Sequence, residues 1–184
     1  PLWGVTLRLA IAAVALGAIA MLTRARFPRG AALRDVVAYG VLQFGLNLAF
    51  LYWGEQAVPS GITAVVFATA PLQTALYSRI LGVEAIDRVK LLAAIVAVAG
   101  VAIIFAGQLN VGVPPVGLTA VFLASTSAAI AVVLLHRAGP QSAWAINAIG
   151  APIGAAMGLV ASLLLLAVLV AGLGLRWLEQ RQRR

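Results

Sequence analysis

The chain has 184 residues, of which 63% are hydrophobic and only 10% are charged, and its mean hydropathy is +1.06. A soluble domain carries about 25% charged residues to cover its surface, so most of this chain must be surrounded by lipid. The net charge is +8, and the basic residues cluster in short segments between apolar runs. That pattern is typical of membrane topology rather than of nucleic-acid binding, so we expect no nucleic-acid partner.

The residues that usually carry chemistry are scarce. The sequence has no cysteine and one histidine, which excludes disulfides and cysteine metal sites and argues against a histidine metal site. It contains no HExxH, Gly-x-Ser-x-Gly or P-loop motif, and no pair of carboxylates within an apolar segment. We therefore predict no enzyme, no metal and no cofactor. Because the sequence begins with Pro1 and shows no signal-peptide pattern, we expect it to start inside a longer protein.

Six segments are long and apolar enough to cross a bilayer, which takes about 20 apolar residues. We expect helices, because lipid offers no partner to the backbone groups of an isolated strand or loop. The segments are 4–22, 36–53, 61–81, 89–107, 116–135 and 143–175. The predicted fold class is therefore all-α, a polytopic transmembrane helix bundle of about six spans.

The connections alternate in charge. Basic residues occur in 23–35, 82–90 and 136–142, whereas 54–60 and 108–115 have none. Since Lys and Arg resist translocation, the basic connections are predicted to be cytoplasmic, with the start of the chain outside. Six spans then place the arginine-rich end of the chain outside as well, against the same rule. Either this tail is an exception, or the last segment breaks near its glycines and Pro152, or the chain is truncated at a junction.

Two of the segments carry polar residues four positions apart, which places them on one helix face. They are Tyr39, Gln43 and Asn47 in the second segment and Thr69, Gln73 and Tyr77 in the third. We take the two helices to be adjacent. Each stripe either lines a substrate path near the bilayer midplane or joins helices through hydrogen bonds. For both stripes together we favour the path.

Pro71 interrupts the third segment. It lacks an N–H, so it should deprive the Phe67 carbonyl of its usual partner and bend the helix. Such breaks occur at transporter binding sites and also as passive kinks. Arg8, in the first segment, either reaches for the outer interface or contacts an anion or carboxylate.

Three further groups have mainly structural interpretations. The run Ser125-Thr126-Ser127 is expected to hydrogen-bond across helices or to its own backbone. Gly150, Gly154 and Gly158 form a small-residue face that predicts close helix packing. Glu84 and Asp87, beside Arg88 and Lys90, are expected to form a solvated turn.

The order of motifs in 55–106 resembles an EamA domain of the drug/metabolite transporter superfamily. The motifs are Val58-Pro59-Ser60-Gly61-Ile62-Thr63-Ala64, Ala70-Pro71-Leu72, Leu81-Gly82-Val83-Glu84 and Ala97-Val98-Ala99-Gly100-Val101-Ala102. Leu7-Arg8-Leu9 and the run 40–53 resemble the second and third helices of that family. Val83 departs from the family pattern by separating the Gly-Glu pair.

The resemblance implies a partial form of a ten-helix transporter built from two inverted five-helix repeats. Residues 1–106 would be one repeat lacking its first helix, and 107–184 the start of a second repeat with a basic tail. It implies a secondary transporter, an exporter of small metabolites or drugs through a central cavity, in the plasma or inner membrane. The implied partners are the lipid bilayer, a small-molecule substrate, and a second copy or another protein supplying the missing helices. The alternative is a truncated or non-transporting membrane protein or partner subunit.

Overall fold

The structure is a computed structural model that describes residues 2–108 and 112–182, with side chains described for 3–108 and 112–168. Every regular element in these residues is helical, which confirms the all-α class. The α-helices are α1 (Leu2–Leu22), α2 (Ala31–Gly40), α3 (Leu48–Gly54), α4 (Ser60–Ala68), α5 (Ala70–Ile80), α6 (Arg88–Ile104), α7 (Pro115–Arg137) and α8 (Ala143–Gln182). A π-helix, η1 (Val41–Asn47), joins α2 to α3, and a 3₁₀ turn, η2 (Ala106–Gln108), follows α6.

Among the described residues, four helices are long and apolar enough to cross a membrane, whereas the sequence predicted about six spans. They are Trp3–Leu22, Ala31–Gly54, Pro115–Arg137 and Ala143–Val168. The third predicted span is divided between α4 and α5, and the fourth is α6, which has 17 residues. The difference therefore comes from one interrupted helix and one helix at the lower limit of spanning length, about 17 residues.

The division of the third span lies at Thr69. Its N–H donates to the Val66 carbonyl at 3.1 Å and its Oγ1 to the same carbonyl at 2.6 Å, which closes a tight turn. Pro71 then falls in the first turn of α5, where a missing N–H leaves no helical bond unmade. The expected bend is thus an end of α4 at Thr69 followed directly by the start of α5.

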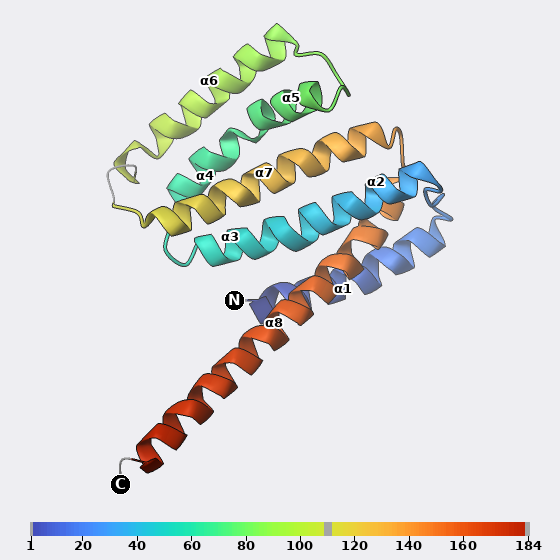
Figure 1. Cartoon of the computed structure of the whole chain (residues 1–184). Coiled ribbons are helices and arrows are strands. Elements are labelled where there is room, and N and C mark those ends of the chain that lie inside the picture. Colours follow the sequence, from blue (N-terminus) through green and yellow to red (C-terminus); the bar gives the residue numbers. More distant parts are fainter. Residues whose placement is uncertain (1, 109–111, 183–184) are drawn as a thin grey trace.

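The bundle is organised around α7, which packs against α2, η1 and α3 on one side and α4 and α5 on the other. Figure 1 shows these helices side by side, with α6 at one edge and the α1–α8 pair at the opposite edge. The buried face of α7 consists mainly of small residues, so its neighbours approach closely. They are Gly117, Ala120, Val121, Ala124, Ser125, Ser127, Ala129, Ala131 and Val133.

The predicted adjacency of the two helices that carry the polar stripes is wrong. The helices that carry the two polar stripes, α2–η1–α3 and α4–α5, lie on opposite sides of α7 (Figure 1). Chain order suggested that they were neighbours, but the fifth predicted span inserts between them. A path shared by both stripes would therefore have to run along α7.

The glycine face of α8 meets η1 and α1. A Cβ atom on Gly150 would lie 2.6 Å from the Phe44 ring, and one on Gly158 would lie 2.7 Å from the Thr6 hydroxyl. On Gly154 it would lie 2.8 Å from the Phe44 carbonyl oxygen. The absence of side chains at these positions therefore sets how closely α8 approaches the other two helices.

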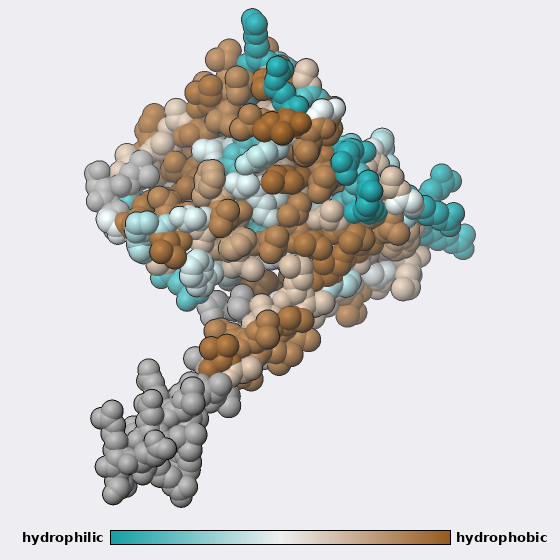
Figure 2. Space-filling view, in the orientation of Figure 1, coloured by the Kyte–Doolittle hydropathy of each residue, from teal (hydrophilic) through white to brown (hydrophobic). Residues whose placement is uncertain are grey.

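The three basic connections, between α1 and α2, α5 and α6, and α7 and α8, lie at the same end of the bundle (Figure 1). Figure 2 shows hydrophobic residues over most of the visible surface and hydrophilic residues mainly toward the ends of the helices. Exposed large apolar side chains lie on several helices, as expected for a bundle solvated by lipid.

α8 continues as one helix of 40 residues through Pro152, so of the three explanations offered for the basic tail the structure does not support a helix break there. A proline can lie inside a membrane-spanning helix because neighbouring helices supply hydrogen-bond partners for the backbone groups that the proline leaves unpaired. At 1.5 Å per residue, α8 is about 60 Å long, roughly twice the hydrocarbon thickness. The arginine side chains of the predicted basic tail lie outside the described side chains, and residues 183–184 lie outside the described structure.

The packing of α8 predicts opposite effects for two Gly→Ala substitutions. Gly154→Ala should destabilise the protein by about 1–3 kcal/mol, because the new methyl group meets a backbone carbonyl as well as side chains. Gly100→Ala, in α6, meets nothing within 4 Å and should be neutral or stabilising by up to about 1 kcal/mol. Thermal unfolding of both variants in detergent measures this; equal stability of the two would contradict the packing.

Candidate functional site

Gln73 is the centre of a hydrogen-bond network between α5 and α7. Its Nε2 donates to Thr69 Oγ1 at 2.9 Å and to Ser125 Oγ at 3.0 Å. Its Oε1 accepts from Thr126 Oγ1 at 3.0 Å. Both ends of the amide are thus bonded within the protein. This part of the third-segment stripe joins helices in the structure.

Ser127, the next hydroxyl residue of α7, bonds the helix on the other side of α7. Ser127 Oγ donates to the Leu42 carbonyl in η1 at 2.9 Å. A π-helical turn changes the regular i→i−4 pairing of the backbone, and such turns are frequent at functional sites. The run 125–127 therefore connects α7 to the helices on both its sides, as expected for hydrogen bonding across helices.

Gln43 and Asn47 behave differently from Gln73. Gln43 Oε1 and Asn47 Oδ1 are buried and have no hydrogen-bond partner within the described residues. Asn47 is only 4% exposed. A buried polar atom without a partner costs about 1–3 kcal/mol, so native proteins rarely leave one without a reason. The two amides in η1 consequently carry hydrogen-bonding capacity that no described residue uses.

Among the described residues, no hydrogen bond joins one polar stripe to the other. Tyr39 packs edge-on against Phe44, with ring centroids 6.0 Å apart, and its side chain is half-buried. Tyr77 is half-buried in α5. Pro71 lines a groove between α5, α6 and α7, away from η1. The structure thus unites Thr69 and Gln73 with α7 but does not unite all six residues in one cavity.

Arg8 is exposed and its Nη1 donates to the Tyr52 hydroxyl of α3 at 2.9 Å. The contact links α1 to α3 at the end of the bundle opposite to the basic connections. In the described structure the partner of Arg8 is therefore a neutral phenol, and the two expected roles stay predictions.

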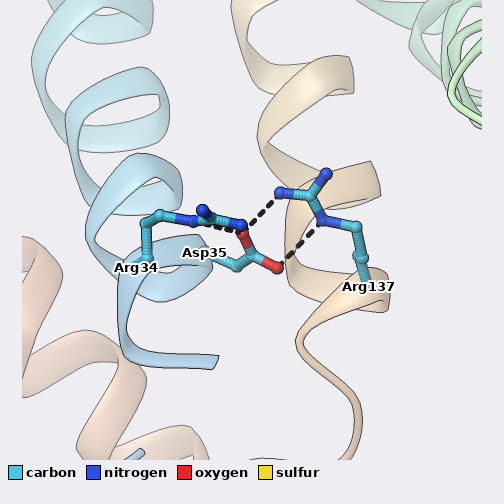
Figure 3. Close-up of polar contacts among 3 residues, drawn as sticks. All are labelled: Arg34, Asp35 and Arg137. Atoms are coloured by element: carbon cyan, nitrogen blue, oxygen red, sulfur yellow. Dashed lines mark hydrogen bonds and ion pairs between the residues drawn. The ribbon is translucent and has the colours of Figure 1, made fainter. Parts of the chain in front are cut away.

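A buried ion pair links α2 to α7 at the end that carries the basic connections. Arg137 Nε donates to Asp35 Oδ2 at 2.9 Å and Nη2 to Oδ1 at 2.5 Å, a bidentate arrangement (Figure 3). The Asp35 side chain is 6% exposed, and that of Arg137 is 44% exposed. Arg34 Nε lies farther away, 3.9 Å from Asp35 Oδ1.

The sequence does not predict this pair. Asp35 ends a predominantly basic connection, and Arg137 lies 102 residues later. One signal was present: Asp35 is the acidic residue directly before an apolar segment, where an unpaired carboxylate is unfavourable. The identity of its partner depends on α7 packing beside α2.

Breaking this ion pair should destabilise the protein. Asp35→Asn and Arg137→Gln should each lower the Tm more than Arg34→Gln, because they remove a bidentate, buried contact. The double variant should lose less than the sum of the single losses. Thermal unfolding in detergent tests this, and additive effects would show that the two side chains do not interact.

Comparison with known proteins identifies the family to which this chain is similar. The profile of the EamA-like transporter family matches residues 1–106. The chain is also 29% identical over 130 residues to "Uncharacterized transporter YdfC" of Bacillus subtilis (strain 168), which covers 71% of this chain and 42% of that protein. The chain thus spans less than half the length of this relative. No solved structure matches the chain. Since the profile covers more than half of an apolar, all-helical chain, the protein belongs to the EamA-like transporter family.

Proposed function

We propose that the chain forms part of a secondary transporter that exports small metabolites or drugs across the plasma membrane. Family membership supports transport rather than catalysis. The observation that carries the proposal is the pair of buried, unpartnered amide oxygens on Gln43 and Asn47 inside an apolar bundle. Intramembrane polar groups without a protein partner are expected where a substrate or water passes.

The two helices that flank α7 support this location. Each is interrupted near its middle, one by η1 and the other by the turn at Thr69. Transporter sites typically form near the bilayer midplane at such interruptions, where backbone groups leave the regular helical pattern. We therefore propose that a polar substrate moves along α7, with Gln43 and Asn47 contacting it. The hydrogen bonds of Gln73 and Thr69 with the hydroxyls of α7 would hold α5 against α7 beside this path.

The complete transporter would contain more helices than this chain. The chain covers 42% of the relative that it matches, and we propose that a second copy or another protein supplies the other side of a central cavity. Alternating access would then move one helical unit against the other. The sequence has no P-loop, which supports an ion or solute gradient as the energy source.

Substitutions in the two stripes distinguish residues that contact the substrate from residues that only stabilise the fold, because the two kinds affect export and stability differently. Gln43→Leu and Asn47→Leu should reduce export about tenfold without loss of stability, because they remove only unpartnered amides. Gln73→Leu should instead lower stability by about 1 kcal/mol, because it breaks bonds to α7. The measurements are efflux of ethidium and of radiolabelled metabolites from expressing cells, and thermal unfolding.

The control for that experiment is the amount of folded protein in the membrane. Unchanged export by both the Gln43 and Asn47 variants at equal expression would remove the proposed substrate contact. The second candidate function is a non-transporting membrane protein or partner subunit. An expressed, folded protein that forms stable monomers and exports none of the probes would support that alternative.

The proposed orientation places the basic connections in the cytoplasm. The chain has no native cysteine, so single cysteines can be introduced at Ala31 and Gln56, both exposed and at opposite ends of the bundle. In intact cells an impermeant thiol reagent should label Gln56→Cys and not Ala31→Cys. Labelling of both after permeabilisation is the control, and the reverse pattern in intact cells would invert the topology.

A further inference from the structure

A groove of about 680 Å³ lies between α5, α6 and α7, separate from the amides of η1. Its wall consists mainly of small and apolar side chains, including Ala75, Leu91 and Ala94. One end is bordered by charged or titratable side chains, Glu84, Lys90 and His136. The groove is thus apolar along its length and polar at one end.

The depth of the groove matches one leaflet of a bilayer. It runs along α5 from Ala70, beside the helix interruption, to Ser78 and then to Glu84. The eight helical steps from Ala70 to Ser78 span about 12 Å. Half of the hydrocarbon core is about 15 Å thick. The apolar part therefore has the length of an acyl-chain layer, and the charged end lies at the level of lipid head groups.

One wall of the groove reaches the outer surface of the bundle, because Ala93 of α6 lines the groove and is exposed. α6 packs on α4 and α5 at the edge of the bundle, and its exposed side chains include Leu92, Ile95 and Val96. In a membrane these side chains contact acyl chains directly. A molecule already dissolved in that leaflet can therefore enter between α6 and α7 without crossing water.

The polar groups at the charged end are free to bind a ligand. Within the described residues, the side chains of Glu84, Lys90 and His136 make no hydrogen bond or ion pair. Ser78 is 5% exposed, and its buried Oγ has no hydrogen-bond partner. The Glu84 carboxylate, the Lys90 ammonium and the buried Ser78 hydroxyl thus border one apolar groove. Ser78 lies in α5, ahead of the turn that carries Glu84.

We propose that this groove binds a phospholipid with a primary-amine head group, from the leaflet on the side of the basic connections. Lys90 pairs with the lipid phosphate, and Glu84 accepts hydrogen bonds from its ammonium group. Ser78 donates to an ester carbonyl, which lies between head group and acyl chain. The volume accommodates one acyl chain with its polar end, since ligand sites typically measure about 300–1,000 Å³. This lipid site does not depend on whether the chain transports a solute.

Native mass spectrometry of the purified full chain tests the proposal with three added lipids of identical acyl chains. Phosphatidylethanolamine should be retained more than phosphatidylcholine, whose quaternary ammonium cannot donate to Glu84, and more than phosphatidylglycerol, which lacks an amine. Lys90→Gln should weaken retention about fivefold, the effect of one basic residue near a lipid phosphate. The matched control is Arg88→Gln, which removes the same charge from the same helix outside the groove.

A second pair of variants tests the groove itself. Ala93→Phe should block lipid retention, because Ala93 lines the groove and is exposed enough to accept a larger side chain. Ala97→Phe, on the same helix but outside the groove, should leave retention unchanged. Equal retention of the three lipids would overturn the head-group assignment. Retention unaffected by Ala93→Phe in a protein of normal Tm would overturn the site.

Discussion

The hydroxyl run on α7 is the interaction on which the arrangement of the bundle depends. In lipid no water is available to polar groups, so each must find a partner inside the protein. Ser125 and Thr126 bond the amide of Gln73 on one side, and Ser127 bonds a carbonyl of η1 on the other. Small residues around them let both neighbours approach closely. These bonds fix which helices α7 lies between.

The same constraint makes the exceptions informative. Most polar side chains in the apolar layer are either bonded to another helix, like Gln73, or to their own backbone, like Ser162 and Thr119. Gln43 and Asn47 are not, although they lie in a helix that contacts both α7 and α8. The two stripes, which look alike in the sequence, are thus physically different. The stripe with Thr69 and Gln73 holds helices together, and the stripe with Gln43 and Asn47 carries unused hydrogen-bonding capacity.

The helix interruptions and the ion pair place further limits on the bundle. Thr69 and Pro71 divide one helix near its middle, which separates the groove along α5 from the packed end along α4. At the basic end, the bidentate contact of Arg137 with Asp35 joins α2 to the last turn of α7. This contact lies in the layer where the connections carry most of the positive charge. A carboxylate buried there has a favourable environment only because a guanidinium reaches it.

The sequence by itself determined the all-α class, four of the six predicted spans and an interruption of the third span near Pro71, because hydropathy and the missing N–H of proline act locally. It also identified the hydroxyl run and the glycine face. Only the tertiary structure decided that α7 separates the two polar stripes, that Gln73 is bonded while Gln43 and Asn47 are not, and that Asp35 meets Arg137. These facts depend on which helices become neighbours. Packing across 50 to 100 residues of chain decides that, and a periodic pattern within one helix contains no information about it.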